Sequence, residues 1–197
     1  MSTHCNGPVS QPAPPRRRGP GSRADANHPT RIEILNAAVA LAERDGLRSL
    51  SIADVTAAAG HAKGTFYVHF PDRTALLVAL HRWFHDTVFD RVITITAEDS
   101  RGPGRAQRRL LAFLDACREL PGVRALLLDA RTEPAITAEV DERNGQATQI
   151  LASDLTGTSH PREKARILVL AAADIAARES TEGRKLPAAR QALLEIV

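Results

Sequence analysis

The segment from Gly60 to Phe70 constrains the fold of this chain more than any other part of its sequence. Gly60 can adopt a positive φ without a steric penalty, as a tight turn between two helices requires. The short helix expected after this turn carries hydrogen-bond donors of several lengths at Lys63, Thr65, Tyr67 and His69. This pattern is typical of a helix-turn-helix whose second helix contacts phosphates and base edges in the major groove. An ordinary polar turn between two core helices is the alternative.

The sequence before this segment predicts two further helices. Residues 30–46 have apolar positions at helical spacing, with a capping-box pattern at Thr30 and Glu33 and a closing glycine at Gly46. Ser51 is expected to cap a second helix over residues 52–59. A three-helix core is expected to be filled by side chains from the third helix and the connecting loop, namely Phe66, Phe70, Leu47 and Leu50. Pro71 is expected to open a fourth helix, because its missing amide hydrogen would be unpaired there in any case.

Residues 30–80 as a whole resemble the DNA-binding domain of the TetR family of transcriptional regulators. The resemblance is carried by several spaced segments in the right order, which are residues 34–38, 41–42, 51–55, 59–60, 63–70 and 71–77. It implies phosphate or base contacts from Lys63, Thr65, Tyr67, His69 and Arg73, and we add Arg31 and Ser51 as further candidate DNA contacts. It also implies a homodimer that binds a palindromic operator and a small-molecule effector that releases it.

Two residues depart from the family pattern at the start of the recognition helix. Position 62, where the family usually has Ser or Thr as the N-cap, is Ala62, and the preceding small aliphatic residue is replaced by His61. An alanine N-cap costs about 0.5–2 kcal/mol relative to Ser or Thr. Two consequences are open: His61 substitutes as a polar partner, or the helix orders fully only on DNA.

The charge distribution agrees with DNA binding by the N-terminal part. Nine of the 26 Lys and Arg residues and six of the 23 Asp and Glu residues lie at or before Leu80, so the net charge of +3 lies there. Residues 1–29 are rich in proline and arginine and are predicted to be a disordered tail. A solvated tail is favoured over an arm in which Arg16, Arg17, Arg18 and Arg23 reach the DNA.

The two cysteines, Cys5 and Cys117, give no disulfide pattern, and no apolar run has membrane-spanning length. We therefore expect a soluble cytoplasmic protein that does not associate with membranes. We find no nucleophile elbow, no phosphate loop and no paired acid/base carboxylates, so neither catalysis nor a cofactor is expected. His81 and His85, at i and i+4, are half of a possible metal site, but without a third ligand they are better interpreted as exposed or pocket-lining histidines.

Beyond the fourth helix the chain is predicted to be all-α. We divide it into a DNA-binding domain over residues 30–76 and a helical effector-binding and dimerisation domain over residues 77–197, with about nine helices in all. The fourth helix is expected over residues 71–96 and crosses this boundary, and the fifth to ninth helices are expected over residues 103–120, 123–130, 134–155, 162–180 and 187–197.

The eighth helix, expected over residues 162–180, carries apolar residues on nearly all its faces, so neighbouring elements must bury it on more than one side. TetR-like proteins pair their last two long helices across a two-fold axis. The resemblance therefore implies a dimer interface formed by Leu168, Ala172, Ile175, Ala176, Leu193 and Leu194.

An internal cavity for a mostly apolar effector is expected to be lined by Trp83, Phe84, Phe113 and Cys117. The interpretation of the whole sequence is a TetR-like repressor that a small molecule releases from its operator. The alternative is a constitutive DNA-binding architectural protein without an effector.

Overall fold

The computed structural model of this protein describes residues 28–120 and 134–197. In these residues there are eight α-helices, one 3-10 helix and no strand, which confirms the predicted all-α class. The elements are α1 (Pro29–Asp45), η2 (Leu47–Ser49), α2 (Ile52–Ala58), α3 (Lys63–His69), α4 (Arg73–Ile95), α5 (Pro103–Glu119), α7 (Pro134–Ala152), α8 (Pro161–Glu182) and α9 (Pro187–Glu195). The predicted helix over residues 123–130 and the predicted tail, up to residue 27, lie outside the described residues.

Helix α1 begins at Pro29, and the expected capping box is not formed. The imidazole Nδ1 of His28 accepts from the amide of Thr30 at 3.2 Å, so His28 is the N-cap. The carboxylate of Glu33 instead lies 2.7 Å from Nε2 of His61, which follows α2 in the turn before the next helix. The prediction was wrong because Pro29 starts the helix one residue early and His28 already supplies the acceptor. Gly46 closes the helix as expected, with φ of 81°.

Helix α4 begins at Arg73 and not, as predicted, at Pro71. Asp72 has an extended backbone and its Oδ1 accepts from the amide of Ala75 at 2.8 Å, which makes it the N-cap. A short acidic side chain satisfies an unpaired amide and favours the positive end of the helix dipole. Proline therefore precedes the helix here and does not start it.

The three N-terminal helices pack around the predicted core. Phe66, Phe70, Leu47 and Leu50 are all buried, as expected, and they lie with Ile34 of α1. The first turns of α4 belong to the same core, since Leu76, Leu77 and Leu80 are also buried. Helix α4 is therefore anchored in the N-terminal domain before it continues into the other half of the molecule.

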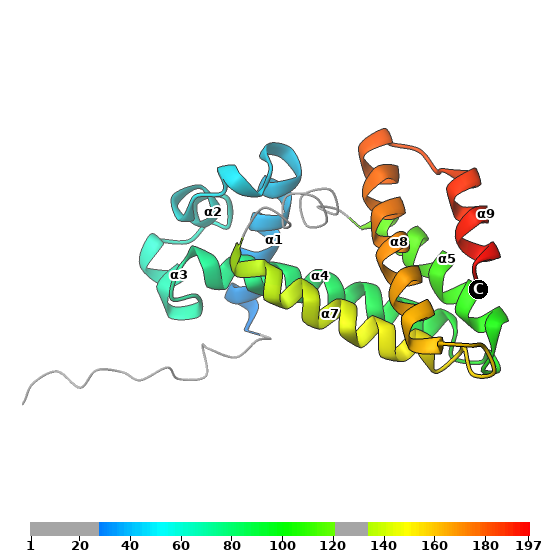
Figure 1. The fold of residues 1–197 in the computed structure, drawn as a ribbon. Coiled ribbons are helices and arrows are strands. Elements are labelled where there is room, and N and C mark those ends of the chain that lie inside the picture. The colour runs from blue at the N-terminus through cyan, green and yellow to red at the C-terminus, as the bar shows by residue number, and fades with distance from the viewer. Residues whose placement is uncertain (1–27, 121–133) are drawn as a thin grey trace, which may run out of the picture.

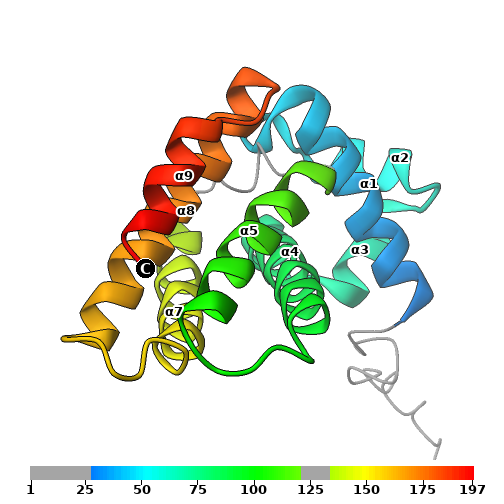
Figure 2. The same cartoon turned by 90° about the vertical axis from the view of Figure 1, so that its right-hand side faces the viewer.

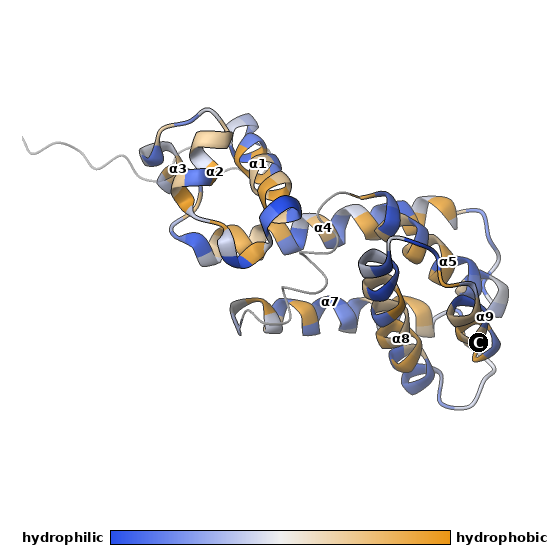
Figure 3. Cartoon of the chain, turned by 90° about the horizontal axis from the view of Figure 1, so that it is seen from above, coloured by the Kyte–Doolittle hydropathy of each residue, from blue (hydrophilic) through white to orange (hydrophobic). Residues whose placement is uncertain are grey.

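The C-terminal half is built on α4, α5, α7 and α8. Helix α7 lies beside α4, α8 packs across α7, and α5 packs against α4 and α8 (Figure 1). Helix α9 lies next to α8 and α5 at the end of the molecule that is remote from α3 (Figure 2). Seen from above, α4 joins the group of α1, α2 and α3 to the group that contains α5, α8 and α9 (Figure 3). Its 23 residues span about 35 Å at about 1.5 Å per residue, so one rigid helix connects the two halves.

Candidate functional site: a recognition helix and an internal cavity

Helices α2 and α3 form the predicted helix-turn-helix. The hydroxyl of Ser51 accepts from the amide of Asp54 at 3.1 Å and caps α2, as expected. Gly60 has φ of +71°, a left-handed conformation that disfavours a side chain even though the space around its Cα is open. The amide of His61 donates to the carbonyl of Thr56 at 2.9 Å and closes the turn. These hydrogen bonds and the left-handed Gly60 define the start of α2 and the turn between α2 and α3.

Helix α3 is held by a single deeply buried side chain and presents most of its other residues outward. Phe66 has no exposed surface, whereas Lys63 and Tyr67 are exposed and Thr65 and His69 are half-buried. Among the described residues, Lys63 has no ion-pair partner. The four positions that the sequence assigned to DNA contacts therefore lie together on one short helix.

The N-terminus of α3 has no side-chain cap. Ala62 has the extended backbone of an N-cap residue but cannot accept a hydrogen bond through its methyl group. His61 does not replace the missing cap, because its ring pairs with Glu33 of α1. The first amides of α3 therefore lack the side-chain acceptor that a serine would supply.

The remaining candidate DNA contacts have a second role inside the domain. The guanidinium of Arg31 lies 4.2 Å from the centre of the Phe70 ring, and burial lowers the pKa of this arginine. Arg73 donates to the carbonyls of Leu50 at 2.8 Å and Leu47 at 2.6 Å. Both side chains tie neighbouring elements to the core, a role that sequence reasoning did not anticipate.

Helices α4, α5, α7 and α8 enclose a cavity of about 410 Å³. This volume lies within the range of about 300–1,000 Å³ that small-molecule sites occupy. The cavity is lined mainly by apolar side chains, and its polar residues are His81, His85, Arg109, Arg143, Asn144 and Asp174.

Phe113 lines this cavity as predicted, but Trp83, Phe84 and Cys117 do not. Phe84 and Cys117 are buried in the core, and Trp83 packs against that core. Burial also raises the pKa of the Cys117 thiol, so this cysteine is an apolar core residue. The prediction was wrong for these three because the face of α4 that borders the cavity carries residues 81, 85, 88, 89, 92 and 93, which follow one another at i+3 and i+4 spacing.

His81 and His85 both line the cavity, with ring centroids 4.5 Å apart. His81 is only 2% exposed, and both of its ring nitrogens are buried without a hydrogen-bond partner in the described part of the chain. Burial lowers the pKa of His81 to about 4. Burial, together with the neighbouring His81, lowers the pKa of His85 to about 3. Both imidazoles are therefore neutral near pH 7.

No group of three potential metal ligands occurs within residues 28–120 and 134–197.

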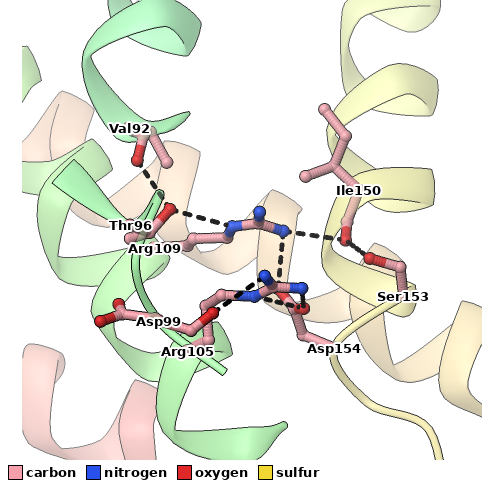
Figure 4. Close-up of polar contacts among 8 residues, drawn as sticks. All are labelled: Val92, Thr96, Asp99, Arg105, Arg109, Ile150, Ser153 and Asp154. Atoms are coloured by element: carbon pink, nitrogen blue, oxygen red, sulfur yellow. Dashed lines mark hydrogen bonds and ion pairs between the residues drawn. The ribbon is translucent and has the colours of Figure 1, made fainter. Parts of the chain in front are cut away.

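Arg109, at one end of the cavity lining, belongs to a cluster with Arg105 and the buried Asp154 (Figure 4). Asp154 has no exposed surface, and its two oxygens accept from Nε of Arg105 at 2.7 Å and Nη1 of Arg109 at 2.6 Å. Arg109 also donates to the hydroxyl of Thr96 at 3.3 Å and the carbonyl of Ile150 at 3.2 Å. The cluster therefore joins the ends of α4 and α7 to α5, and Arg109 faces the cavity.

The other end of the cavity has a balanced ion cluster. Nε of Arg82 lies 2.9 Å from one oxygen of Glu139, and Nε of Arg143 lies 3.1 Å from the other. Nη1 of Arg143 also pairs with Asp86 at 2.7 Å. Although burial alone would raise it, the hydrogen bonds from the two arginines lower the pKa of Glu139. The two guanidinium groups and the two carboxylates of this cluster are thus paired with one another.

The structure places most of the predicted dimer contacts in the core of a single protomer. Leu194 is half-buried within the protomer. The other predicted contacts are already buried there, namely Leu168, Ala172, Ile175, Ala176 and Leu193. A side chain that packs against its own α5 and α7 cannot also pack against a second copy. On α8, Ile167 remains 58% exposed, and Leu170, which also borders the cavity, remains 47% exposed. Asp174 is exposed on the same helix.

Among residues 28–120 and 134–197, no helix combines the length and apolar character needed to cross a bilayer.

Comparison with known proteins agrees with this geometry. Residues 34–80 match the family model of bacterial regulatory proteins of the tetR family. The uncharacterized HTH-type transcriptional regulator YuxN of Bacillus subtilis is 33% identical over 82 residues, which are 41% of this chain and 28% of that protein. The nucleoid occlusion factor SlmA of Sodalis glossinidius is 26% identical over 121 residues, or 61% of this chain and 59% of SlmA. The chain thus spans less than two thirds of the length of either relative.

Similarity to a solved structure extends over most of the chain. The multidrug binding protein EbrR, whose crystal structure is a complex with imidazole, superposes with a TM-score of 0.66 at 25% identity. The match covers 89% of this chain and 92% of EbrR, so it includes the C-terminal helices. Residues 34–80 thus form a helix-turn-helix domain that is similar to the one of the tetR family of bacterial regulatory proteins.

Proposed function

We propose that this protein is a homodimeric transcriptional regulator that binds a palindromic operator through α3. The observation that supports this most directly is the outward display of Lys63 and Tyr67 on a helix anchored by Phe66. Lys63 and Tyr67 are suited to phosphate contacts, and Thr65 is suited to a base edge. A second copy would present a second α3 to the next half-site, as two-fold symmetry requires.

We further propose that a small molecule in the cavity regulates DNA binding as a release signal. Helix α4 contributes six cavity-lining residues, from His81 to Ile93, and its first turns belong to the core of the DNA-binding domain. Arg73, at the start of α4, holds the loop before α2. A ligand that shifts α4 would therefore also shift the domain that positions α3, and an opposite preference of ligand and operator would produce release.

The test is a footprint on DNA that flanks the gene of this protein, followed by affinity measurements at several salt concentrations. Lys63→Ala should flatten the slope of log affinity against log salt by about 2, since a dimer loses two phosphate contacts at about 0.9 each. Thr65→Ala should instead change operator preference more than salt dependence. Arg118→Ala is the matched control, because Arg118 is an exposed cation on α5 and should leave the slope unchanged. Unaltered slope and operator choice in both α3 variants would contradict the assignment.

A second candidate function is constitutive DNA binding without an effector. The similarity to SlmA, a nucleoid occlusion factor, favours it, because that match covers 61% of this chain. The two functions differ in one measurement. If compounds that fill the cavity weaken the footprint, the protein is a regulator. If the footprint is the same with and without a compound in the cavity, the protein is a constitutive binder.

A further inference from the structure

The cavity between α4, α5, α7 and α8 is elongated along α4. Its lining on that helix extends from His81 to Ile93, which corresponds to about 18 Å at about 1.5 Å per residue. Most of the wall between these ends is apolar, with Val88, Val92, Leu110 and Phe113 among its residues. A long apolar body suits this shape better than a compact polar one.

The charges that border the cavity are balanced at one end and unbalanced at the other. Near His81, the guanidinium groups of Arg82 and Arg143 are matched by the carboxylates of Glu139 and Asp86. At the opposite end, Arg105 and Arg109 share the single carboxylate of Asp154. Buried charges are stable when each one has a partner. The Arg105–Arg109–Asp154 cluster therefore has one cation more than it can neutralise.

Neighbouring acidic residues do not remove this excess. Asp99 accepts from Arg105 through its carbonyl, but its carboxylate pairs with Arg108 at 2.6 Å. Asp174 lines the cavity from α8 but is exposed, so solvent screens its charge. His81 and His85 are neutral and supply hydrogen bonds only. Among the described residues of the cavity wall, Arg109 is thus the one partly buried cation that lacks a carboxylate of its own.

From this charge count we propose that the cavity binds an elongated apolar monoanion, with a carboxylate-type head group paired to Arg109. This inference rests on the proposed role of the cavity as an effector site. The balanced cluster near His81 offers no second cation, so the far end of the ligand is uncharged. A head group at Arg109 would contact the cluster that ties Thr96, at the end of α4, to α5 and α7.

The experiment compares three ten-carbon probes by calorimetry on the full chain without DNA: decanoate, 1-decanol and decyltrimethylammonium. They share the apolar body and differ in the charge of the head group. Decanoate should bind at least tenfold more tightly than decanol, and the cation should bind most weakly. Equal affinity for decanoate and decanol, or tightest binding of the cation, would overturn the proposal.

Variants of Arg109 locate the head group. Arg109→Met should lower the affinity for decanoate to that for decanol without weakening decanol, whereas Arg109→Lys should keep most of the preference. Arg118→Met is the control, since Arg118 is an exposed arginine of α5 that does not line the cavity, and it should leave decanoate binding unchanged. Retention of the full preference in Arg109→Met would refute the assignment. If that variant does not fold, the probe comparison with the natural protein and with Arg109→Lys still decides.

Because these titrations contain no DNA, they test the ligand class separately from the proposal that the protein is a regulator. A decanoate preference without any effect on the footprint would support the ligand class and contradict effector control. A footprint released by decanol and decanoate at equal concentrations would support effector control and contradict the ligand class.

Discussion

At the scale of single residues, the C-terminal half depends on a few buried charged groups held by guanidinium partners. Asp154 and Glu179 have no exposed surface; Asp154 accepts three hydrogen bonds from arginine and Glu179 accepts two. Glu179 of α8 pairs with Arg190 of α9, and it also accepts from the amide of Leu186 at 2.8 Å. Such pairs contribute little compared with a packed apolar core, but the loss of one partner leaves the other charge buried.

Glu179→Gln should therefore destabilise the protein by about 3 kcal/mol in urea unfolding. This figure is at the low end for a buried pair, because Asp115 still pairs with Arg190 at 2.7 Å in the variant. Arg184→Gln is the control, since its pair with Glu182 is exposed and is expected to contribute less than about 1 kcal/mol. Similar losses in the two variants would contradict the importance of burial.

The two cavity histidines make stability depend on pH. Their folded pKa values, about 4 for His81 and about 3 for His85, lie below the unfolded value of about 6.5. The unfolded chain therefore binds more protons below pH 6.5, and stability is complete above that pH and falls as the pH approaches 4. At pH 5 we expect a loss of about 2 kcal/mol for each histidine.

Urea unfolding at pH 7.5, 6.0 and 5.0 measures this loss. Replacement of both histidines by leucine is the control and should flatten the profile over this range. A natural protein whose stability is unchanged between pH 7.5 and 5.0 would show that the imidazoles are not buried in neutral form.

At the scale of elements, the weak point of the DNA-binding domain is the N-terminus of α3. Ala62→Ser should supply the missing acceptor and stabilise the domain by about 0.5–2 kcal/mol, because Ala62 already has the extended backbone of an N-cap. Thermal unfolding measures the gain, and Ala53→Ser, at an exposed position inside α2, is the control and should not stabilise. If Ala62→Ser is no more stable than the natural protein, the first amides of α3 already have other hydrogen-bond acceptors.

At the scale of the whole molecule, the outer face of α8 is the surface that we expect to join two protomers. Ile167→Arg should give a monomer in light scattering and weaken operator binding strongly, since both half-sites must be engaged together. The chain should remain folded, because Ile167 is 58% exposed in the protomer. Ile95→Arg, at an exposed apolar position of α4, is the control and should remain dimeric. A dimeric Ile167→Arg variant would place the interface elsewhere.

Local sequence alone determined most of the helices, the cap at Ser51, the closure of α1 at Gly46 and the core position of Phe66. These features depend on hydrophobic periodicity and on interactions within a few residues, which sequence displays directly. The tertiary structure decided which face of each helix is covered. Leu168 and Ala172 pack inside one protomer and Phe84 faces away from the cavity, because burial depends on which helices become neighbours. Arg109 and Asp154 are 45 positions apart, so the pairing that leaves a cation at the cavity wall exists only after α5 and α7 pack.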